Sequence, residues 1–343
     1  MKIYTIKEIA KKAGVSSGTV DRVLHNRGKV SPDKEERVKK ILDEIDYRPN
    51  QIARSLKLNK RYSFVVLLPD DELDEYWEPC FNGINELKDS FEEKGIIIHV
   101  LKYSPGMPGD FIDKTKISLE LRPDGVLLGA LFLNESKRFL KELEDKGIPY
   151  NLINTAVSAA NYNTFVGHNL IQSGRTAAHL FDCMLKEIDS ILIVHLEEEF
   201  ENAFHMQQKE NGFRSYFSEN EKRINVQTIN LKTNGTGADL KLLKEKLKEN
   251  IQGIFVTTSK AYLIAGMDID PGIPIVGYDL LLRNVQYLKS GSIKFLIYQN
   301  PKLQAYEGLS LLADFVLKSI PNPKEKYLPI EIVSRENVDS YNF

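Results

Sequence analysis

Apolar residues near the start of the chain recur at helical spacing. Between Ile6 and Ala13 they follow the i, i+3, i+4, i+7 pattern of one helix face, and Gly14 supplies a stop signal. Thr5 and Glu8 form a T-x-x-E capping box, because each side chain can bond the backbone N–H of the other residue. The pattern therefore predicts a short amphipathic helix.

A second and a third helix are predicted close behind the first. Ser16 can cap a helix from about Ser17 to His25, and Ser31 followed by Pro32 is typical of the start of another, which reaches about Ile45. The turn between the first two helices is short and contains a glycine. These two helices are therefore predicted to form a helix-turn-helix, whose second helix can enter the major groove of DNA.

The polar side of the second predicted helix carries groups that can read bases. Ser17, Gly18, Arg22 and Asn26 face away from its apolar stripe. The planar guanidinium of Arg22 matches the O6 and N7 acceptors of guanine. A further helix of about seven residues is predicted from Asn50, and it is too short to be stable unless something such as bound DNA holds it.

From Phe64 onward the pattern changes to short apolar runs that alternate with helical stretches, such as 79–94 and 135–147. This alternation is typical of parallel strands joined by crossover helices. Eight strands are expected, in residues 64–68, 95–101, 125–131, 148–153, 191–196, 226–231, 253–258 and 273–279. The count predicts an α/β fold of two doubly wound lobes behind a small all-α headpiece. In such lobes ligands bind beyond the carboxyl ends of the strands.

Charge divides the chain at the same place. Residues 1–61 hold 16 Lys and Arg against 8 Asp and Glu, whereas the remaining residues hold 30 against 40. A basic head on an acidic body is typical of a module that binds a polyanion and is attached to a second unit, although a basic solvated face is the alternative. At 343 residues the chain is long enough for two or three compact units.

Several classes of protein are disfavoured by what the sequence lacks. No tract of about 18 apolar residues is present and the N-terminus has no signal-peptide pattern, so we expect no membrane span and a cytoplasmic location. Cys80 and Cys183 lie far apart without metal-ligand spacing, so two buried free thiols, no metal and no cofactor are expected. An enzyme is also disfavoured, because the nearest glycine motif, 234–237, lacks the spacing of a dinucleotide fingerprint.

Three segments carry a family resemblance: I-K-E-I-A-K-K-A-G-V-S-S-G-T-V-D-R-V-L at 6–24, V-S-P at 30–32 and Y-R-P-N-Q-I-A-R-S-L at 47–56. Together they resemble the lactose-repressor (LacI/GalR) family of transcription regulators. The resemblance implies that Tyr47 and Asn50 lie near phosphates, and that Ala53 and Leu56 of a hinge helix enter the minor groove. Leu56 as a plain linker residue is the alternative.

The DNA-binding residues expected from the helix pattern and the resemblance are Thr5, Ser16, Ser17, Gly18, Thr19, Arg22, Asn26, Tyr47, Asn50, Ala53 and Leu56. Two positions depart from the family pattern. Gly18 has no side chain with which to read a base, and Asp21 replaces the usual Ser at a position close to phosphates.

The resemblance extends over about 62–335 and implies a sensor of periplasmic-binding-protein type I architecture, with a small molecule bound between its lobes. The expected domains are a helix-turn-helix domain at 1–49, a hinge helix and linker at 50–61, and an effector-binding domain at 62–343. Within the last, lobe 1 is expected at about 62–155 plus 296–322, and lobe 2 at about 156–295 plus 323–343.

The candidate ligand site combines residues near predicted strand ends with two residues, His168 and Lys209, that the resemblance implies. Its members are Asp70, Tyr76, Trp77, Asn154, His168, Lys209, Asp279 and Gln299. Trp77 beside Tyr76 offers an apolar face for a sugar ring, or else packs under its loop. Asp279 can accept hydrogen bonds from ligand hydroxyls, or else caps a helix from a buried turn.

Two of these positions depart from the family pattern. His168 replaces an Asp and, because histidine titrates near ~6.5, could make binding pH-sensitive; a satisfied surface histidine is the alternative. Lys209 replaces an Arg that normally makes paired hydrogen bonds to ligand. A lysine is a point charge, so the ligand is anionic or bound with different geometry, or Lys209 is a solvated helix residue.

The sequence thus predicts a sequence-specific DNA-binding regulator, a repressor, whose operator affinity is controlled by a small molecule, a sugar or sugar derivative. A homodimer is expected, because two helix-turn-helix units can read the half-sites of a near-palindrome. The alternative is a solute-binding protein of the cell envelope, which shares the two-lobed unit. The basic segment 1–61 and the missing signal argue against that alternative.

Overall fold

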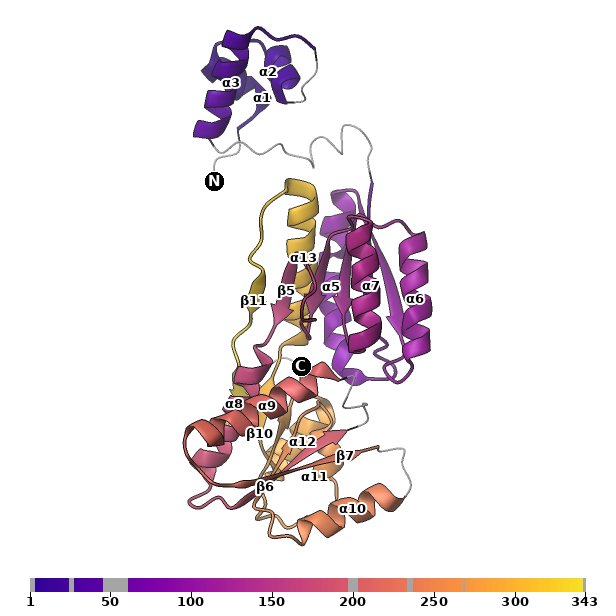
Figure 1. The fold of residues 1–343 in the computed structure, drawn as a ribbon, viewed down its shortest axis with the longest axis vertical. Coiled ribbons are helices and arrows are strands. Elements are labelled where there is room, and N and C mark those ends of the chain that lie inside the picture. Colours follow the sequence, from indigo (N-terminus) through magenta and orange to yellow (C-terminus); the bar gives the residue numbers. More distant parts are fainter. Residues whose placement is uncertain are drawn as a thin grey trace. The chain divides into compact units, whose positions relative to one another are not determined.

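A computed structural model describes residues 4–24, 28–45, 61–196, 203–232, 237–267 and 269–341. The chain forms two compact units, a helical unit made mainly of residues 1–54 and a two-lobed unit made mainly of residues 55–343. Figure 1 shows the three helices of the first unit and the α/β lobes of the second.

The helical unit has the three predicted helices, α1 (Ile6–Ala13), α2 (Ser17–Leu24) and α3 (Pro32–Glu44). The capping box is confirmed: the Glu8 N–H donates to Thr5 Oγ1 at 3.3 Å, and the Thr5 N–H donates to Glu8 Oε2 at 2.8 Å. Gly14 ends α1 with φ 65°, a left-handed conformation that favours glycine. Ser31 stands at the N-cap of α3 as predicted, but its side chain makes no capping hydrogen bond.

The core of the helical unit is small. Its buried apolar residues are Ile9, Ala10, Ala13, Val20, Val23 and Val38. Every helix contributes to it, so no helix is stabilised by its own sequence alone. The segment predicted to form the hinge helix lies outside the described residues.

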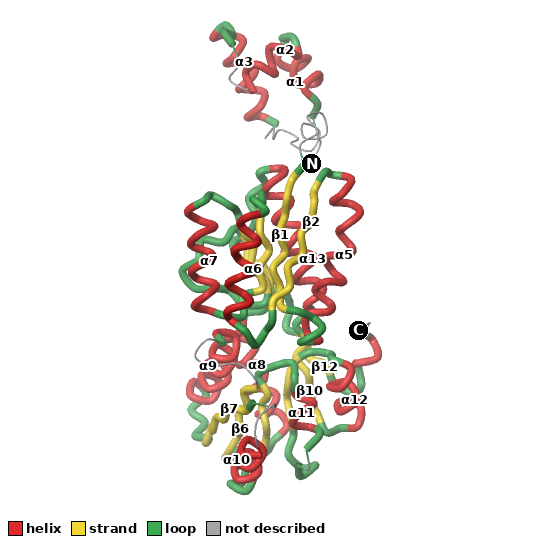
Figure 2. Tube along the Cα trace, turned by 90° about the vertical axis from the view of Figure 1, so that its right-hand side faces the viewer, coloured by secondary structure: helices red, strands yellow, loops and turns green. Residues whose placement is uncertain are grey.

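Lobe 1 is built on a parallel sheet with the strand order β11-β5-β4-β3-β1-β2. Its strands are β1 (Tyr62–Pro69), β2 (Ile96–Tyr103), β3 (Gly125–Gly129), β4 (Tyr150–Ile153), β5 (Thr164–Gly167) and β11 (Glu325–Tyr327). Its helices are η1 (Glu75–Trp77), α5 (Glu78–Glu93), α6 (Pro108–Glu120), α7 (Leu133–Asp145) and α13 (Pro301–Lys318). Figure 2 shows α5 and α13 on one face of this sheet and α6 and α7 on the other.

Lobe 2 is built on a second sheet, with the order β12-β10-β9-β8-β6-β7, in which β12 alone runs antiparallel to its neighbour. Its strands are β6 (Ser190–Leu196), β7 (Asn225–Leu231), β8 (Gly253–Val256), β9 (Ile275–Tyr278), β10 (Ile293–Tyr298) and β12 (Glu331–Val333). Its helices are α8 (Leu170–Met184), α9 (Phe204–Glu219), α10 (Gly237–Leu247), α11 (Ala261–Ala265), α12 (Leu282–Ser290) and η2 (Val338–Ser340). Helices α8 and α9 share one core cluster with the sheet, and α10, α11 and α12 share another.

The predicted class, two doubly wound lobes behind a helical headpiece, is confirmed, and all eight expected strands are present. The expected lobe boundaries need correction, because the chain crosses between the lobes after β5, β10 and β11. Residues 164–167 and 325–327 therefore belong to lobe 1, and residues 296–298 to lobe 2. Strands β5, β11 and β12 hold three or four residues each, and such short runs carry little local signal.

Helices α8 and α9 approach each other closely because each has a glycine at the contact. A Cβ added at Gly174 would lie 1.9 Å from the Lys209 carbonyl oxygen, and one added at Gly212 would lie 1.9 Å from the Ile171 carbonyl oxygen. The glycine at 212, three residues after Lys209, therefore serves backbone packing. This packing fixes the position of α9, which carries Lys209.

The two cysteines differ in their surroundings. Cys80 is buried as expected, but Cys183 is exposed on α8, so the expectation of a second buried thiol is wrong.

Over the described residues, no helix is long and apolar enough to cross a membrane.

Candidate functional site

Helix α2 presents a polar face to solvent. Ser17, Gly18 and Arg22 are exposed, whereas Val20 and Val23 on the opposite side are buried in the core. This is the arrangement expected of a helix whose outer face contacts a partner.

The remaining predicted DNA-binding residues of the helical unit also have local roles. Ser16 Oγ accepts the Thr19 N–H at 3.2 Å and lies 2.9 Å from Thr19 Oγ1, so these two side chains secure the start of α2. The Thr5 side chain is engaged in the α1 cap. Five predicted residues lie outside the described residues: Asn26, Tyr47, Asn50, Ala53 and Leu56.

A cleft in the two-lobed unit is lined from both sheets. Its lining residues are Asp74, Tyr76, Trp77, Leu131 and Asn154 from lobe 1, and Leu196, His205, Lys209, Thr258, Ser259, Lys260, Asp279 and Gln299 from lobe 2. Asn154, Asp279 and Gln299 each follow a strand end directly, which is where parallel α/β sheets place their ligands. The structure thus brings together six of the eight predicted ligand residues.

Asp70 and His168 do not line this cleft. Asp70 Oδ1 accepts the Glu72 N–H at 3.1 Å and lies 3.7 Å from Lys102 Nζ. His168 is buried, and burial together with the Lys209 cation lowers its pKa to about 4. The alternative of a surface histidine is therefore wrong, and burial disfavours the charged ring, contrary to the expected titration near ~6.5.

Lys209 is a buried cation, contrary to the alternative of a solvated helix residue. Lys209 is 2% exposed, and its Nζ donates to the Thr257 carbonyl at 2.9 Å. Nζ also lies 3.6 Å from the centre of the Tyr278 ring, at a distance typical of a cation–π contact. These contacts hold the ammonium group at the cleft wall.

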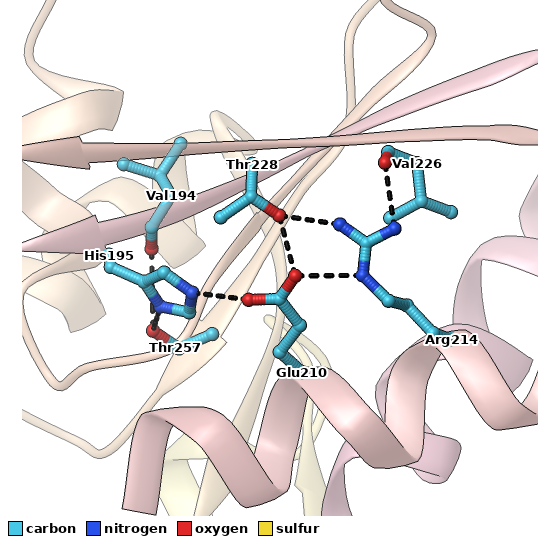
Figure 3. A network of polar contacts seen from close by, with 7 residues as sticks. All are labelled: Val194, His195, Glu210, Arg214, Val226, Thr228 and Thr257. Atoms are coloured by element: carbon cyan, nitrogen blue, oxygen red, sulfur yellow. Dashed lines mark hydrogen bonds and ion pairs between the residues drawn. The ribbon is translucent and has the colours of Figure 1, made fainter. Parts of the chain in front are cut away.

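A polar network seats α9 on the sheet of lobe 2 (Figure 3). His195 Nε2 lies 2.7 Å from Glu210 Oε2, and its Nδ1 lies 2.7 Å from Thr257 Oγ1. Arg214 Nε and the Thr228 hydroxyl both donate to Glu210 Oε1 at 2.7 Å. Burial alone would raise the pKa of Glu210, but the hydrogen bonds from His195, Thr228 and Arg214 outweigh it and lower that pKa to about 2.

This network bears on the cleft because Glu210 is the next residue after Lys209. Thr257, which contacts both His195 and Lys209, is followed directly by the lining residues Thr258–Lys260. The network therefore fixes two parts of the lobe 2 wall relative to each other.

Asp279 is a buried carboxylate at the end of β9. Its two oxygens accept the Gln299 backbone N–H at 3.1 Å and the Gln299 Nε2 group at 2.7 Å, so it joins two strand ends and does not cap a helix. Burial raises its pKa to about 6, although the Lys209 charge and the Gln299 hydrogen bonds oppose that shift. Asp279 and Asn154 have φ of 64° and 67°, a left-handed conformation that costs energy in residues other than glycine and often occurs at functional sites.

Trp77 packs under its loop and also borders the cleft. It is 1% exposed, and its ring lies so close to Gly129 that a Cβ there would be 2.8 Å away. One part of Trp77 nevertheless borders the cleft, and Tyr76 packs edge-on against it with ring centres 5.0 Å apart. The Tyr76 hydroxyl is buried and has no hydrogen-bond partner among the described residues, so it can bond a ligand.

Sequence reasoning missed several lining residues. Thr258–Lys260 follow β8, and the strand-end rule could have found them. Asp74 lies within the loop after β1, and its side chain accepts the Tyr76 N–H at 3.2 Å. His205 lies at the start of α9 and had no sequence signal.

The cleft suits binding of a small polar molecule. Carboxylates and amide oxygens can accept hydroxyl hydrogen bonds, lysines and hydroxyls can donate, and Trp77 adds an apolar surface. Within the described parts of the chain, no group of three or more His, Cys, Asp or Glu side chains could hold a metal ion.

A helix-turn-helix unit joined to a two-lobed binding unit defines a class, the DNA-binding regulators that respond to a small molecule. Comparison with protein families agrees: the lacI family of bacterial regulatory proteins matches residues 5–50, and the periplasmic binding protein domain matches residues 64–318. The chain belongs to the lacI family of bacterial regulatory proteins and, as a member, is a transcription regulator.

Relatives and solved structures fit this assignment. The HTH-type transcriptional regulator MalR of Streptococcus pneumoniae is 41% identical over 80 residues, 23% of this chain and 24% of that protein. The ribose operon repressor of Lactococcus lactis is 22% identical over 352 residues, 97% of this chain and 98% of that protein. A crystal structure assigned as a LacI transcriptional regulator from Bacteroides fragilis has 29% identity and a TM-score of 0.77, and it covers 82% of this chain and 100% of its own.

Proposed function

We propose that this chain binds operator DNA through its helical unit and that a small polyhydroxylated molecule in the cleft controls that binding. The observation that carries the proposal is the combination, in one chain, of a helix with an exposed polar face and a cleft lined from two lobes. A solute-binding protein without a regulatory role would have no use for the helical unit. The cleft is proposed to bind a ligand and not to catalyse a reaction.

In the DNA-bound state, Arg22 would contact a base edge from α2, with Ser17 and Gly18 beside it. The basic charge of residues 1–61 would contribute phosphate contacts. Ala53 and Leu56 would enter the minor groove from a hinge helix formed on DNA.

The proposed effector is a sugar or a sugar derivative. Trp77 offers an apolar surface for one face of a sugar ring, and Asp279, Asn154 and Gln299 offer hydroxyl partners. The name of the Lactococcus lactis relative, a ribose operon repressor, supports this class. Because Lys209 and Lys260 both line the lobe 2 wall, sugar acids and sugar phosphates belong among the candidates.

The working assembly is proposed to be a homodimer. Strand β2 forms one edge of the lobe 1 sheet, and Ile97 and Val100 on it are 41% and 42% exposed. Apolar residues on an open sheet edge are a hazard unless a partner covers them, and a second copy of this chain would do so. Two copies would also place two α2 helices on the half-sites of a near-palindrome.

The DNA-binding part is tested by selecting duplexes for the full chain from a random library and measuring affinity against salt. Phosphate contacts should make log affinity fall steeply as log salt rises. Arg22→Ala should lower affinity for the selected duplex about tenfold or more, in line with one base contact. Arg37→Ala, which removes the same charge from α3, is the matched control and should lose much less.

A DNA affinity that does not change with salt, or equal losses of affinity for the Arg22 and Arg37 variants, would contradict contact between α2 and the bases.

The effector part is tested by thermal unfolding of the full chain with neutral sugars, sugar acids and sugar phosphates. A ligand at ~100 times its dissociation constant adds ~2.7 kcal/mol of stability. Stabilisation of the two-lobed unit by one class would identify the effector chemistry. No stabilisation by any class would contradict a sugar-derived effector while leaving the DNA-binding part intact.

A further inference from the structure

One ion pair joins the two lobes beside the cleft. Arg283 at the start of α12 in lobe 2 lies with its NH2 group 2.7 Å from Glu75 Oε1 of η1 in lobe 1. The two residues are 208 positions apart in the chain. The pair therefore exists only when the lobes are brought together.

The lobe 1 partner lies within a segment whose other residues line the cleft. Glu75 lies between Asp74 and Tyr76, which both line the cleft, as does Trp77. The three residues of η1 are tied to Asp74, whose carboxylate accepts the Tyr76 N–H. Movement of this wall therefore moves the Glu75 carboxylate as well.

The lobe 2 partner is held equally firmly. The Arg283 guanidinium lies 3.8 Å from the centre of the Tyr262 ring, which restricts the side chain although it is about half exposed. The planar group can stack on the ring and still donate to a carboxylate at its edge.

The next residue, Asn284, links this anchor to the lining loops of lobe 2. It is fully buried, and its Nδ2 group donates to the carbonyls of Ser259, Tyr278 and Asp279 at 2.7–3.0 Å. Its Oδ1 accepts the Tyr262 N–H at 2.8 Å. Asn284 thus positions the loop after β8, the loop after β9 and the ring on which Arg283 lies.

We propose that Glu75 and Arg283 form an interlobe clasp, anchored by Asn284, that couples the position of the two cleft walls to lobe closure. A ligand that contacts both Trp77 and Asp279 would order the same two segments that carry the clasp. Lobe closure and ligand contact therefore favour each other. The clasp goes beyond the proposed function, because it operates whatever the effector is.

The chain contains its own reporter of closure. Trp77 is the only tryptophan in the sequence, lies two residues from Glu75 and is 1% exposed. Opening of the cleft would admit a small quencher to its ring. Quenching of Trp77 fluorescence by acrylamide, in the full chain without added ligand, therefore measures the open fraction.

The test uses the variants Glu75→Gln and Arg283→Met and the double variant. An exposed ion pair shifts an equilibrium by roughly two- to fivefold, so each single variant should raise the quenching constant by about that factor. The double variant should quench no more than the stronger single one, because each single change already breaks the pair. Lys289→Ala, which removes a lysine paired with Asp339 within lobe 2, is the control and should leave quenching unchanged.

Two results would overturn the clasp. Quenching equal to that of the unmodified chain in both single variants would show that the pair does not hold the lobes. Additive effects in the double variant would show that Glu75 and Arg283 act separately. Either result leaves the DNA-binding and effector tests above unaffected.

Discussion

The helical unit and the two-lobed unit reach their structures by different routes. In the helical unit, contacts that define the fold join residues close in sequence, such as the Thr5–Glu8 capping box. In the two-lobed unit they join residues far apart, such as the Asn151 side chain and the Gly308 carbonyl, 157 positions away. The helical unit therefore depends on a few local residues, whereas the lobes depend on contacts between distant parts of the chain.

The largest expected effect comes from the lobes. Gly174→Ala would place a Cβ 1.9 Å from the Lys209 carbonyl oxygen, and neither backbone can move away without disturbing α9. We expect the two-lobed unit to lose about 3 kcal/mol or more. Thermal unfolding of the full chain, followed by circular dichroism, should show this loss.

Gly109→Ala provides the matched control for that substitution. Nothing lies within 4 Å of a Cβ added at Gly109, near the start of α6. The variant should be as stable as the unmodified chain or slightly more stable. Equal losses at positions 174 and 109 would contradict the close helix contact.

A pH-dependent effect also belongs to the lobes. The folded-state pKa of Asp279, about 6, lies above its ordinary value of 3.8, so the folded state binds the proton more tightly than the unfolded chain. The stability from this group is complete below about pH 4 and is lost as pH rises through 6, a difference of at most ~3 kcal/mol. Asp279→Asn should therefore flatten the pH dependence between pH 4 and 6 and stabilise the unit at pH 7.

Denaturant unfolding at a series of pH values would measure how the free energy of unfolding depends on pH. Glu210 acts in the opposite direction, because its lowered pKa of about 2 gives stability that is lost as pH falls toward 2. The two contributions occupy different pH ranges, so they can be told apart. An unchanged slope between pH 4 and 6 in Asp279→Asn would contradict the buried ionised carboxylate.

The next expected loss of stability is smaller and concerns the helical unit. Val20 is fully buried in its core, and Val20→Ala removes two methyl groups at a cost of about 2 kcal/mol. A unit of this size has little stability to lose, so DNA binding should fall sharply while the unfolding temperature of the lobes stays the same. Glu36→Ala on the exposed side of α3 is the control. Loss of lobe stability in Val20→Ala would show that the units do not fold separately.

The smallest expected effect is at the cap of α1. Thr5→Ala removes the side-chain acceptor for the Glu8 N–H and should cost about 1 kcal/mol. Thr5→Ser keeps the hydroxyl and should recover most of that loss. Unfolding of the helical unit, followed by its own signal in calorimetry, would distinguish the two variants.

Sequence predicted most where local rules apply. The caps of α1 and α2, the core stripe, the loop residue Trp77 and the strand-end residue Asp279 follow from spacing and pattern, whereas Lys209 follows from the family resemblance. The role of the glycine at 212 does not, because it depends on Ile171 of α8, far earlier in the chain.

The rest depended on long-range geometry. The lobe boundaries, the clasp between Glu75 and Arg283, and the burial that lowers the pKa of His168 all arise from segments that meet only in the folded chain. Asn284 is an example within lobe 2: an ordinary helix residue in the sequence, it organises three backbone carbonyls of the cleft wall.

The proposed regulator requires that occupancy of the cleft changes its affinity for DNA. The affinity of the full chain for its selected duplex would be measured at fixed salt with and without the compound that stabilises the two-lobed unit. A coupling of ~1–3 kcal/mol predicts a change of about 5- to 150-fold. If the compound stabilises the lobes and the DNA affinity does not change, the two units are not coupled and the account is wrong.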